Sequence, residues 1–162
     1  MIHAHDSPAL ASWRHVTRLQ QACNQDDSDP PISPLHDLLC ACACALELDA
    51  VTTAAAQQLL RTCDAAAVPP RPDVAVLGAS LLVAVKAQNG DRKLRDIINV
   101  VHAALSPSSP TLTIGPEFWG LRDAVVLMEQ RLLRACAFQV EFDSSQLQVS
   151  LSRCARHIPL LS

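Results

Sequence analysis

Three closely spaced cysteines are the residues in this sequence best suited to chemistry. Cys40, Cys42 and Cys44 alternate with alanine in an apolar stretch. Cysteine thiolates bind zinc, and a structural zinc site needs four ligands in a tetrahedron. On a helix, Cys40 and Cys44 share a face while Cys42 points about 200° away, so the three thiolates cannot converge on one ion. We therefore interpret them as small buried hydrophobic residues, and we expect no metal, no cofactor and no disulfide.

Two other patterns have a chemical interpretation. His3 and His5 form an H-x-H pair that could bind a metal weakly, although two solvated histidines in a loose terminus account for it more simply. Four serines each precede a proline, namely Ser7, Ser33, Ser106 and Ser109. Proline-directed kinases use this pattern, but Ser-Pro is also a turn signal, and we favour the turn.

Without a glycine-rich phosphate loop, nucleophile elbow or paired carboxylates, the sequence predicts neither an enzyme nor a small-molecule substrate.

Composition narrows the class of protein. The 162 residues are 49% hydrophobic but only 3% aromatic. A core of Leu, Val, Ile, Ala and Cys suits closely packed helices and argues against an all-β sandwich. The formal charge is −3, so the chain lacks the excess of basic residues that phosphate neutralisation requires. This argues against nucleic-acid binding. Because the seven cysteines have no secretory spacing and no cleavable signal segment is recognisable, we expect a reducing compartment, the nucleus or the cytosol.

The chain is organised around an uncharged segment from Val74 to Val85, VAVLGASLLVAV. Apolar side chains fall on every face, so the segment must be buried all round, and its leucines and alanines favour a helix over a buried strand. As a helix it would be about 18 Å long, too short to cross a membrane. Its run of small residues, Gly78 to Ser80, would let neighbouring helices approach closely. Lys86 follows at once, at the end of the most buried element.

Two helices are expected before this segment. The first begins with Pro34 in its first position, where the missing N–H of proline costs nothing. Its buried stripe, at i, i+3, i+4, i+7 and i+11, comprises Leu35, Leu38, Leu39, Cys42 and Leu46. The second begins after Asp49 as N-cap and runs to Val68, where a proline-rich turn stops it.

Two more helices are expected after it. We predict Gly90 at the C′ position of the central helix and Asp91 as the N-cap of the next helix, which ends before Pro107. The apolar stripe of that helix comprises Leu94, Ile97, Ile98, Val101 and Leu105. The last helix opens at Pro116, and its stripe comprises Phe118, Leu121, Val125, Met128, Leu132 and Ala135. Its charged residues on other faces include Arg122, Glu129 and Arg131.

These elements predict an all-α protein with one helical domain. Residues 1–31 are expected to be a disordered N-terminal arm, because their polar and proline-rich stretch breaks any helix. Residues 32–143 are expected to form five helices with a central, buried third helix. Residues 144–162 are expected to be a short C-terminal tail, too short for another domain.

Two stretches of the sequence resemble the cyclin family. LVAVKAQNGDRKLRDIINVVHAAL is similar to the end of the third helix and the fourth helix of the cyclins related to cyclins K, L and T. FWGLRDAVVLMEQRLLRACAFQVEF is similar to their fifth helix, and RDIINVVH paired with FWxLRDxxVxxE most resembles the cyclin Q branch. The resemblance is strong over Lys86 to Phe142 and usable over Leu35 to Val85. It implies a cyclin box in a nuclear regulatory subunit of a cyclin-dependent kinase, of the cyclin-dependent kinase 10 type, acting in the cell cycle or in transcription.

The resemblance also implies a kinase-binding pair. The family's kinase-contacting lysine falls on Lys86 and its glutamate on Glu129, and in cyclins these groups reach the main chain around the kinase's regulatory helix. Apolar contact then supplies affinity while charge-assisted hydrogen bonds fix the register. The kinase helix is pushed inward, so that its glutamate pairs with the lysine that holds the ATP phosphates. The cyclin itself does no chemistry.

The sequence departs from the cyclin pattern in three respects. Lys86-Ala87-Gln88-Asn89 stands where the family usually has Lys-Val-Glu-Glu, and Ala and Cys replace the aromatic residues of the first two helices. We expect no second five-helix box, because the final stretch SLSRCARHIPLLS resembles no part of that repeat. The alternative is therefore a non-activating helical scaffold, or a truncated cyclin-like remnant, that binds protein partners.

Overall fold

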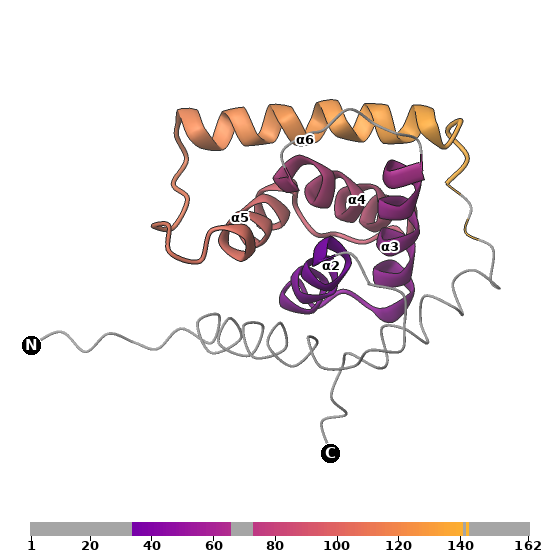
Figure 1. Cartoon of the computed structure of the whole chain (residues 1–162), viewed down its shortest axis with the longest axis horizontal. Helices are drawn as coiled ribbons and strands as arrows, with labels where there is room; N and C mark the ends of the chain where they lie inside the picture. Colours follow the sequence, from indigo (N-terminus) through magenta and orange to yellow (C-terminus); the bar gives the residue numbers. More distant parts are fainter. Residues whose placement is uncertain (1–33, 66–72, 141, 143–162) are drawn as a thin grey trace, which may run out of the picture.

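The segment around residues 73–87 forms the helix on which the others pack. In the computed structural model, which describes residues 34–65, 73–140 and 142, α4 (Asp73–Ala87) is buried without a break from Leu77 to Val85. The helices around it are α2 (Pro34–Ala45), α3 (Ala50–Ala65), α5 (Leu94–Leu105) and α6 (Pro116–Ala135). Figure 1 shows α6 running lengthwise along one side of α4, with α2 on the other side. The predicted central helix is therefore confirmed.

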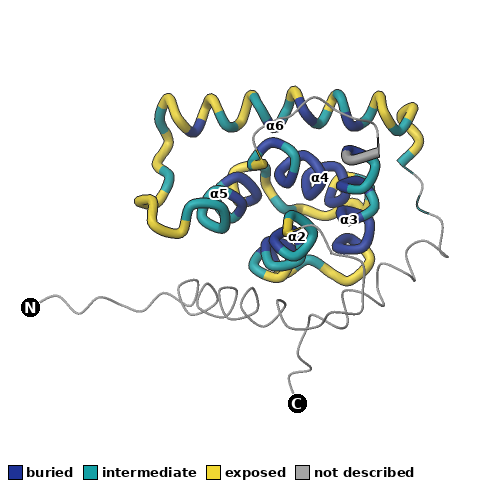
Figure 2. Tube along the Cα trace, viewed as in Figure 1, coloured by how far each residue is buried: buried dark blue, intermediate teal, exposed yellow. Residues whose placement is uncertain are grey.

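The described part of the chain is all-α, as predicted. It contains five helices and no strand, and buried side chains from all five helices form one hydrophobic core, dark blue in Figure 2. Within these residues, no helix is both long and apolar enough to cross a membrane. The predicted arm at 1–31 and tail at 144–162 lie outside the described residues. The same holds for His3, His5, Ser7 and Ser33.

The axes of α4 and α6 come close together at Gly78. A Cβ atom added to Gly78 would lie 2.9 Å from Cγ2 of Val125, which is fully buried in α6. Valine branches at Cβ and has few alternative rotamers, so it cannot easily move away from such an atom. The absence of a side chain at Gly78 therefore lets Val125 of α6 pack directly against the backbone of α4, as the small residues predicted.

Three of the predicted helix starts, those of α2, α3 and α6, agree with the structure. α2 begins at Pro34 and α6 at Pro116. Asp49 caps α3, because its Oδ1 accepts a hydrogen bond from the backbone N–H of Thr52 at 2.6 Å. Hydrogen bonds from the side chain and the backbone of Thr52 hold the pKa of the Asp49 carboxyl below its ordinary value. The predicted end of α3, Val68, lies outside the described residues.

The positions predicted for Gly90 and Asp91 in the turn between α4 and α5 are both wrong. The left-handed residue after α4 is Asn89, with φ of 55°, and Gly90 follows it. The N–H of Gly90 donates to the carbonyl of Val85 at 2.8 Å, which gives a Schellman motif with Asn89 at C′. Asparagine tolerates this conformation better than most residues, so glycine is not needed there. α5 is preceded by Lys93 rather than Asp91 in the N-cap position, and no side chain caps it.

The same motif ends α2 and α6. After α2, Glu47 has φ of 54° and the N–H of Leu48 donates to the carbonyl of Ala43 at 3.0 Å. After α6, Ala137 has φ of 51°, and the N–H of the next residue donates to the carbonyl five positions back at 2.8 Å. Phe138, the next residue, is also left-handed, with φ of 60°. None of these three residues is glycine, so each holds a side chain in a conformation that costs roughly 1–2 kcal/mol for an ordinary residue.

Candidate functional site

Lys86 and Glu129, the two residues that the cyclin resemblance assigns to kinase binding, form an ion pair. They are 43 positions apart in the chain, yet Nζ of Lys86 lies 2.6 Å from Oε1 of Glu129. Lys86 belongs to the last turn of α4, and Glu129 belongs to α6. The packing of these two helices therefore brings both predicted site residues together.

Lys86 lies where α4 leaves the core. The nine preceding residues, 77–85, are all buried, whereas 59% of the Lys86 side chain is exposed. A cation in the last turn also faces the partial negative charge of the helix C-terminus, which favours it there. The carbonyl of Lys86 accepts a hydrogen bond from the N–H of Asn89 at 3.2 Å, so the Schellman motif fixes the backbone that carries the ammonium group.

Glu129 lies beside the buried stripe of α6. Its neighbour Met128 and, one turn earlier, Val125 are buried in the core, and the Glu129 side chain itself is only 12% exposed. A carboxylate with so little contact with water needs a hydrogen-bonded partner, because an unpaired buried charge is costly. Lys86 supplies this partner. The glutamate therefore depends on the lysine more than the exposed lysine depends on the glutamate.

Lys86 keeps hydrogen-bond donors that Glu129 does not use. A lysine ammonium group has three donors, of which Glu129 accepts one in the structure. Because the Lys86 side chain is mostly exposed, its other donors can reach acceptors on another molecule. The half-buried carboxylate meanwhile fixes the position of the ammonium group. The result is an exposed cation held in a defined orientation at the junction of two helices.

Arg131, two positions after Glu129, has an environment that the sequence does not reveal. The apolar spacing places it simply off the buried stripe of α6. In the structure its side chain is partly buried, and its Nη1 is buried with no hydrogen-bond partner among the described residues. Changing Arg131 would alter packing as well as charge. The exposed residues Lys93 and Asp123 are therefore better references for Lys86 and Glu129.

The prediction that the three cysteines of α2 are buried hydrophobic residues is right for Cys42 alone, because the other two lie on a different face of the helix. Cys42 is fully buried, whereas Cys44 is exposed. Burial, together with the nearby Cys44 thiol, raises the pKa of Cys42 to about 12, so this thiol stays protonated and unreactive at neutral pH. Cys40 is partly exposed, and its Sγ accepts a hydrogen bond from Nε2 of Gln57 at 2.8 Å. Over residues 34–65 and 73–140, no three side chains of metal-binding type come together.

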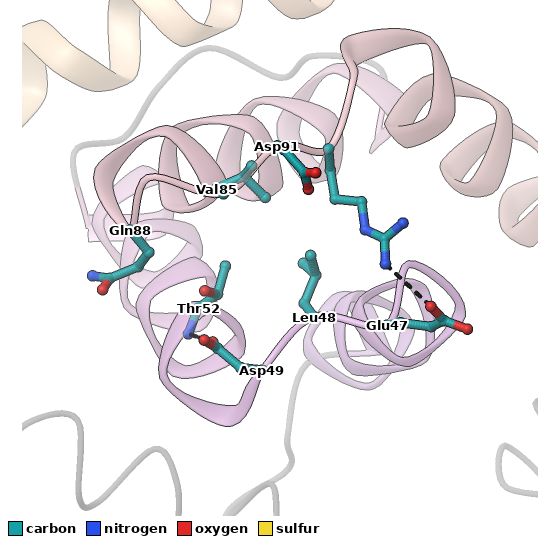
Figure 3. A pocket seen from close by; sticks show the side chains of 9 residues that line it. Glu47, Leu48, Asp49, Thr52, Val85, Gln88 and Asp91 are labelled. Atoms are coloured by element: carbon teal, nitrogen blue, oxygen red, sulfur yellow. Dashed lines mark hydrogen bonds and ion pairs between the residues drawn. The ribbon is translucent and has the colours of Figure 1, made fainter.

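A polar cavity of about 220 Å³ lies between the C-terminal ends of α2 and α4 (Figure 3). Its lining residues are Glu47, Leu48, Asp49, Thr52, Val85, Gln88, Gly90, Asp91 and Arg92. Two of its carboxylates already have partners, because Asp49 caps α3 and Glu47 pairs with Arg92 at 3.2 Å. Gln88 is in the lining, whereas Lys86 and Glu129 are not, so the cavity is separate from the ion pair. No pattern in the sequence indicates this cavity, because it forms between two helix ends that are far apart in the chain.

No family model matches the sequence, and no solved structure matches it. The role of Lys86 and Glu129 is therefore inferred from the sequence resemblance and from the geometry of the pair.

Proposed function

We propose that this chain is a cyclin-like regulatory subunit that binds and activates a cyclin-dependent kinase, of the cyclin-dependent kinase 10 type, in nuclear control of the cell cycle or of transcription. One observation carries the proposal, the 2.6 Å distance between Nζ of Lys86 and Oε1 of Glu129. The cyclin resemblance puts these two residues on one kinase-facing surface, which requires them to be neighbours in space. Two arbitrary residues 43 positions apart need not be neighbours, so their proximity supports the assignment.

The arrangement of the helices gives further support. Five helices around a buried third helix is the outline of a cyclin box, and α4 is the third of the five described helices and the most completely buried. An all-α fold alone fits many functions. The more specific argument is that the only charged residues of α4 are Asp73 in its first turn and Lys86 in its last turn. The residue assigned to the kinase is thus the one cation that this helix offers.

In this proposal the pair acts by positioning a partner. The free donors of Lys86 bind main-chain carbonyls near the kinase's regulatory helix, and Glu129 holds the lysine in place while offering its second carboxylate oxygen as an acceptor. Docking pushes the kinase helix inward, so that the glutamate on that helix meets the lysine that holds the ATP phosphates. The chain itself supplies no catalytic residue, and its partner is a protein rather than a nucleic acid, a membrane or a small molecule.

The test is co-purification of kinases with the tagged chain and with charge-reversed variants. Lys86→Glu and Glu129→Lys should each lower kinase recovery about thirty-fold or more, because reversing a hydrogen-bonded interface charge costs roughly 2–5 kcal/mol. Lys93→Glu and Asp123→Lys make the same charge changes at exposed positions outside the pair and should leave recovery unchanged. Circular dichroism melts of all four variants would show that each one is folded.

A double variant, Lys86→Glu with Glu129→Lys, separates recognition from a purely structural role. It restores an ion pair between α4 and α6 but presents each charge in the wrong place to a partner. If the kinase reads the ammonium group at position 86, the double variant should bind as poorly as the single variants. Recovery of kinase binding in the double variant would show instead that the pair only joins the two helices. Kinase binding that survives both single variants would place the interface elsewhere.

A scaffold that binds protein partners without activating a kinase is the second candidate, and one observation favours it. Gln88 and Asn89 are exposed beside Lys86 at positions where the cyclin family usually has two glutamates. The surface next to the pair therefore lacks two acidic groups that could contact a kinase. Measuring the activity of the co-purified kinase on a peptide substrate distinguishes the candidates. Recovery of a kinase without a rise in its activity would identify the scaffold.

A further inference from the structure

The loop between α5 and α6 contains two serines that each precede a proline, Ser106 before Pro107 and Ser109 before Pro110. By sequence the two are equivalent candidates for a proline-directed kinase or for a simple turn. Their structural surroundings differ. We infer that Ser109 is a phosphorylation site for proline-directed protein kinases and that Ser106 is not. This inference does not depend on the proposed cyclin function, which concerns the opposite end of α6.

Ser106 is tied to the end of α5. Its backbone N–H donates to the carbonyl of His102 at 2.9 Å, and the residue is partly buried. The residues just before it are helical, and Leu105 packs against the hydrophobic core. A kinase can take Ser106 into its active site only if the last turn of α5 unwinds and Leu105 leaves its contacts. This local unfolding lowers the fraction of molecules that can react.

Ser109 is not held by a helix. It is exposed, as are Pro107, Ser108, Pro110 and Thr111 around it. Figure 2 shows this loop as an exposed, yellow stretch between α5 and α6. The backbone N–H of Ser109 donates to the carbonyl of Ser106 at 3.0 Å, across an exposed turn. Residues 110–113 have no helix or strand, although Leu112 packs against the core, so a kinase that binds this segment must break the turn's hydrogen bond and release Leu112 but need not unwind a helix.

Pro110 restricts the backbone conformation of Ser109. Proline disfavours the helical conformation in the residue before it, so Ser109 is biased toward an extended backbone. Phosphoryl transfer depends on aligning the acceptor oxygen with the γ-phosphorus. Oγ of Ser109 would attack the γ-phosphorus of Mg²⁺-bound ATP and form a new P–O bond. The bond from that phosphorus to the β–γ bridging oxygen breaks, ADP leaves, and the hydroxyl proton passes to the catalytic aspartate of the kinase.

The experiment treats the folded chain with Mg²⁺, ATP and a purified mitogen-activated protein kinase, followed by mass-spectrometric fragmentation to assign the phosphate. We expect at least about tenfold more phosphate on Ser109 than on Ser106, because the latter reacts only after local unfolding. Ser109→Ala should remove phosphate from the loop, whereas Ser106→Ala should leave it. Pro110→Ala should lower modification of Ser109 at least about tenfold, because it removes the conformational bias on the serine.

A synthetic peptide with the sequence of residues 102–113 is the matched control, because it carries both serines without the folded α5. Both serines should be phosphorylated in the peptide, so that the preference for Ser109 arises only in the folded chain. Equal or greater modification of Ser106 in the folded chain would overturn the inference. Absence of phosphate on Ser109 in the folded chain would overturn it too, whether or not the peptide reacts.

Discussion

α4 and α6 pack against each other, but they bury very different parts of their surfaces. All residues of α4 from 77 to 85 are buried, whereas α6 buries a single stripe of Phe118, Val125, Met128 and Leu132. On the rest of α6, Trp119 and Leu127 are 50% and 45% exposed. A helix without a solvent face can carry charged residues only at its ends, as α4 does, while a one-sided helix can carry them along its length. Lys86, at the end of the buried helix α4, pairs with Glu129, which lies partway along the one-sided helix α6.

The largest expected change in stability comes from comparing the buried and exposed faces of α6. Leu132→Ala should lower the free energy of unfolding by roughly 2–5 kcal/mol, because Leu132 is fully buried and its removal leaves a cavity. Leu127→Ala makes the same chemical change on the exposed face and should lower it by less than about 0.5 kcal/mol. Urea unfolding followed by circular dichroism measures both. Similar losses for the two variants would mean that the outer face of α6 is also packed against something.

A pair of glycine substitutions tests the difference between the helices directly. Gly78→Ala in α4 should lower the free energy of unfolding by roughly 1–3 kcal/mol, since the new methyl group would meet Val125 in a filled core. Gly120→Ala in α6 should raise it by about 0.5–1 kcal/mol, because nothing lies within 4 Å of the added atom and alanine favours the helix. The same unfolding experiment applies. A stabilising Gly78→Ala would show that α4 and α6 have room to separate.

The smallest expected changes in stability come from the left-handed residues that follow α4 and α6. Ala137→Gly, after α6, should raise the free energy of unfolding by about 0.5–1 kcal/mol, because glycine adopts the left-handed conformation without steric cost. Asn89→Gly, after α4, should change it by less than about 0.5 kcal/mol, since asparagine already tolerates that conformation. Thermal melts of the two variants give the comparison. A larger gain at position 89 would show that the turn beside Lys86 is the more strained of the two.

The helices themselves could be predicted from the sequence. Apolar spacing identified the buried positions of α5 and α6, although Ala135, predicted at the end of the α6 stripe, is exposed where the helix ends. Pro34, Asp49 and Pro116 marked three helix starts, because these signals are local. The turn after α4 was predicted less well. Gly90 is the residue that most readily takes a positive φ, but the Schellman hydrogen bonds put Asn89 in that place.

The candidate site could be predicted only in part. The residues came from the cyclin resemblance, whereas the 2.6 Å contact between Lys86 and Glu129 depends on how α4 and α6 cross. No local pattern contains that information. Nor does spacing along one helix show that a nitrogen of Arg131 is buried, or that the ends of α2 and α4 enclose a cavity.

The ion pair between α4 and α6 also sets which kind of ligand the surface would favour. Glu129 accepts one hydrogen bond from Lys86 across 2.6 Å, so the other donors of the ammonium group are open to an acceptor on another molecule. A ligand that pulled Lys86 away from Glu129 would leave a mostly buried carboxylate unpaired, and that penalty can exceed the gain. A segment of main chain, with an acceptor and a donor side by side, can satisfy both residues at once. We therefore expect the surface to favour exposed backbone over isolated anions.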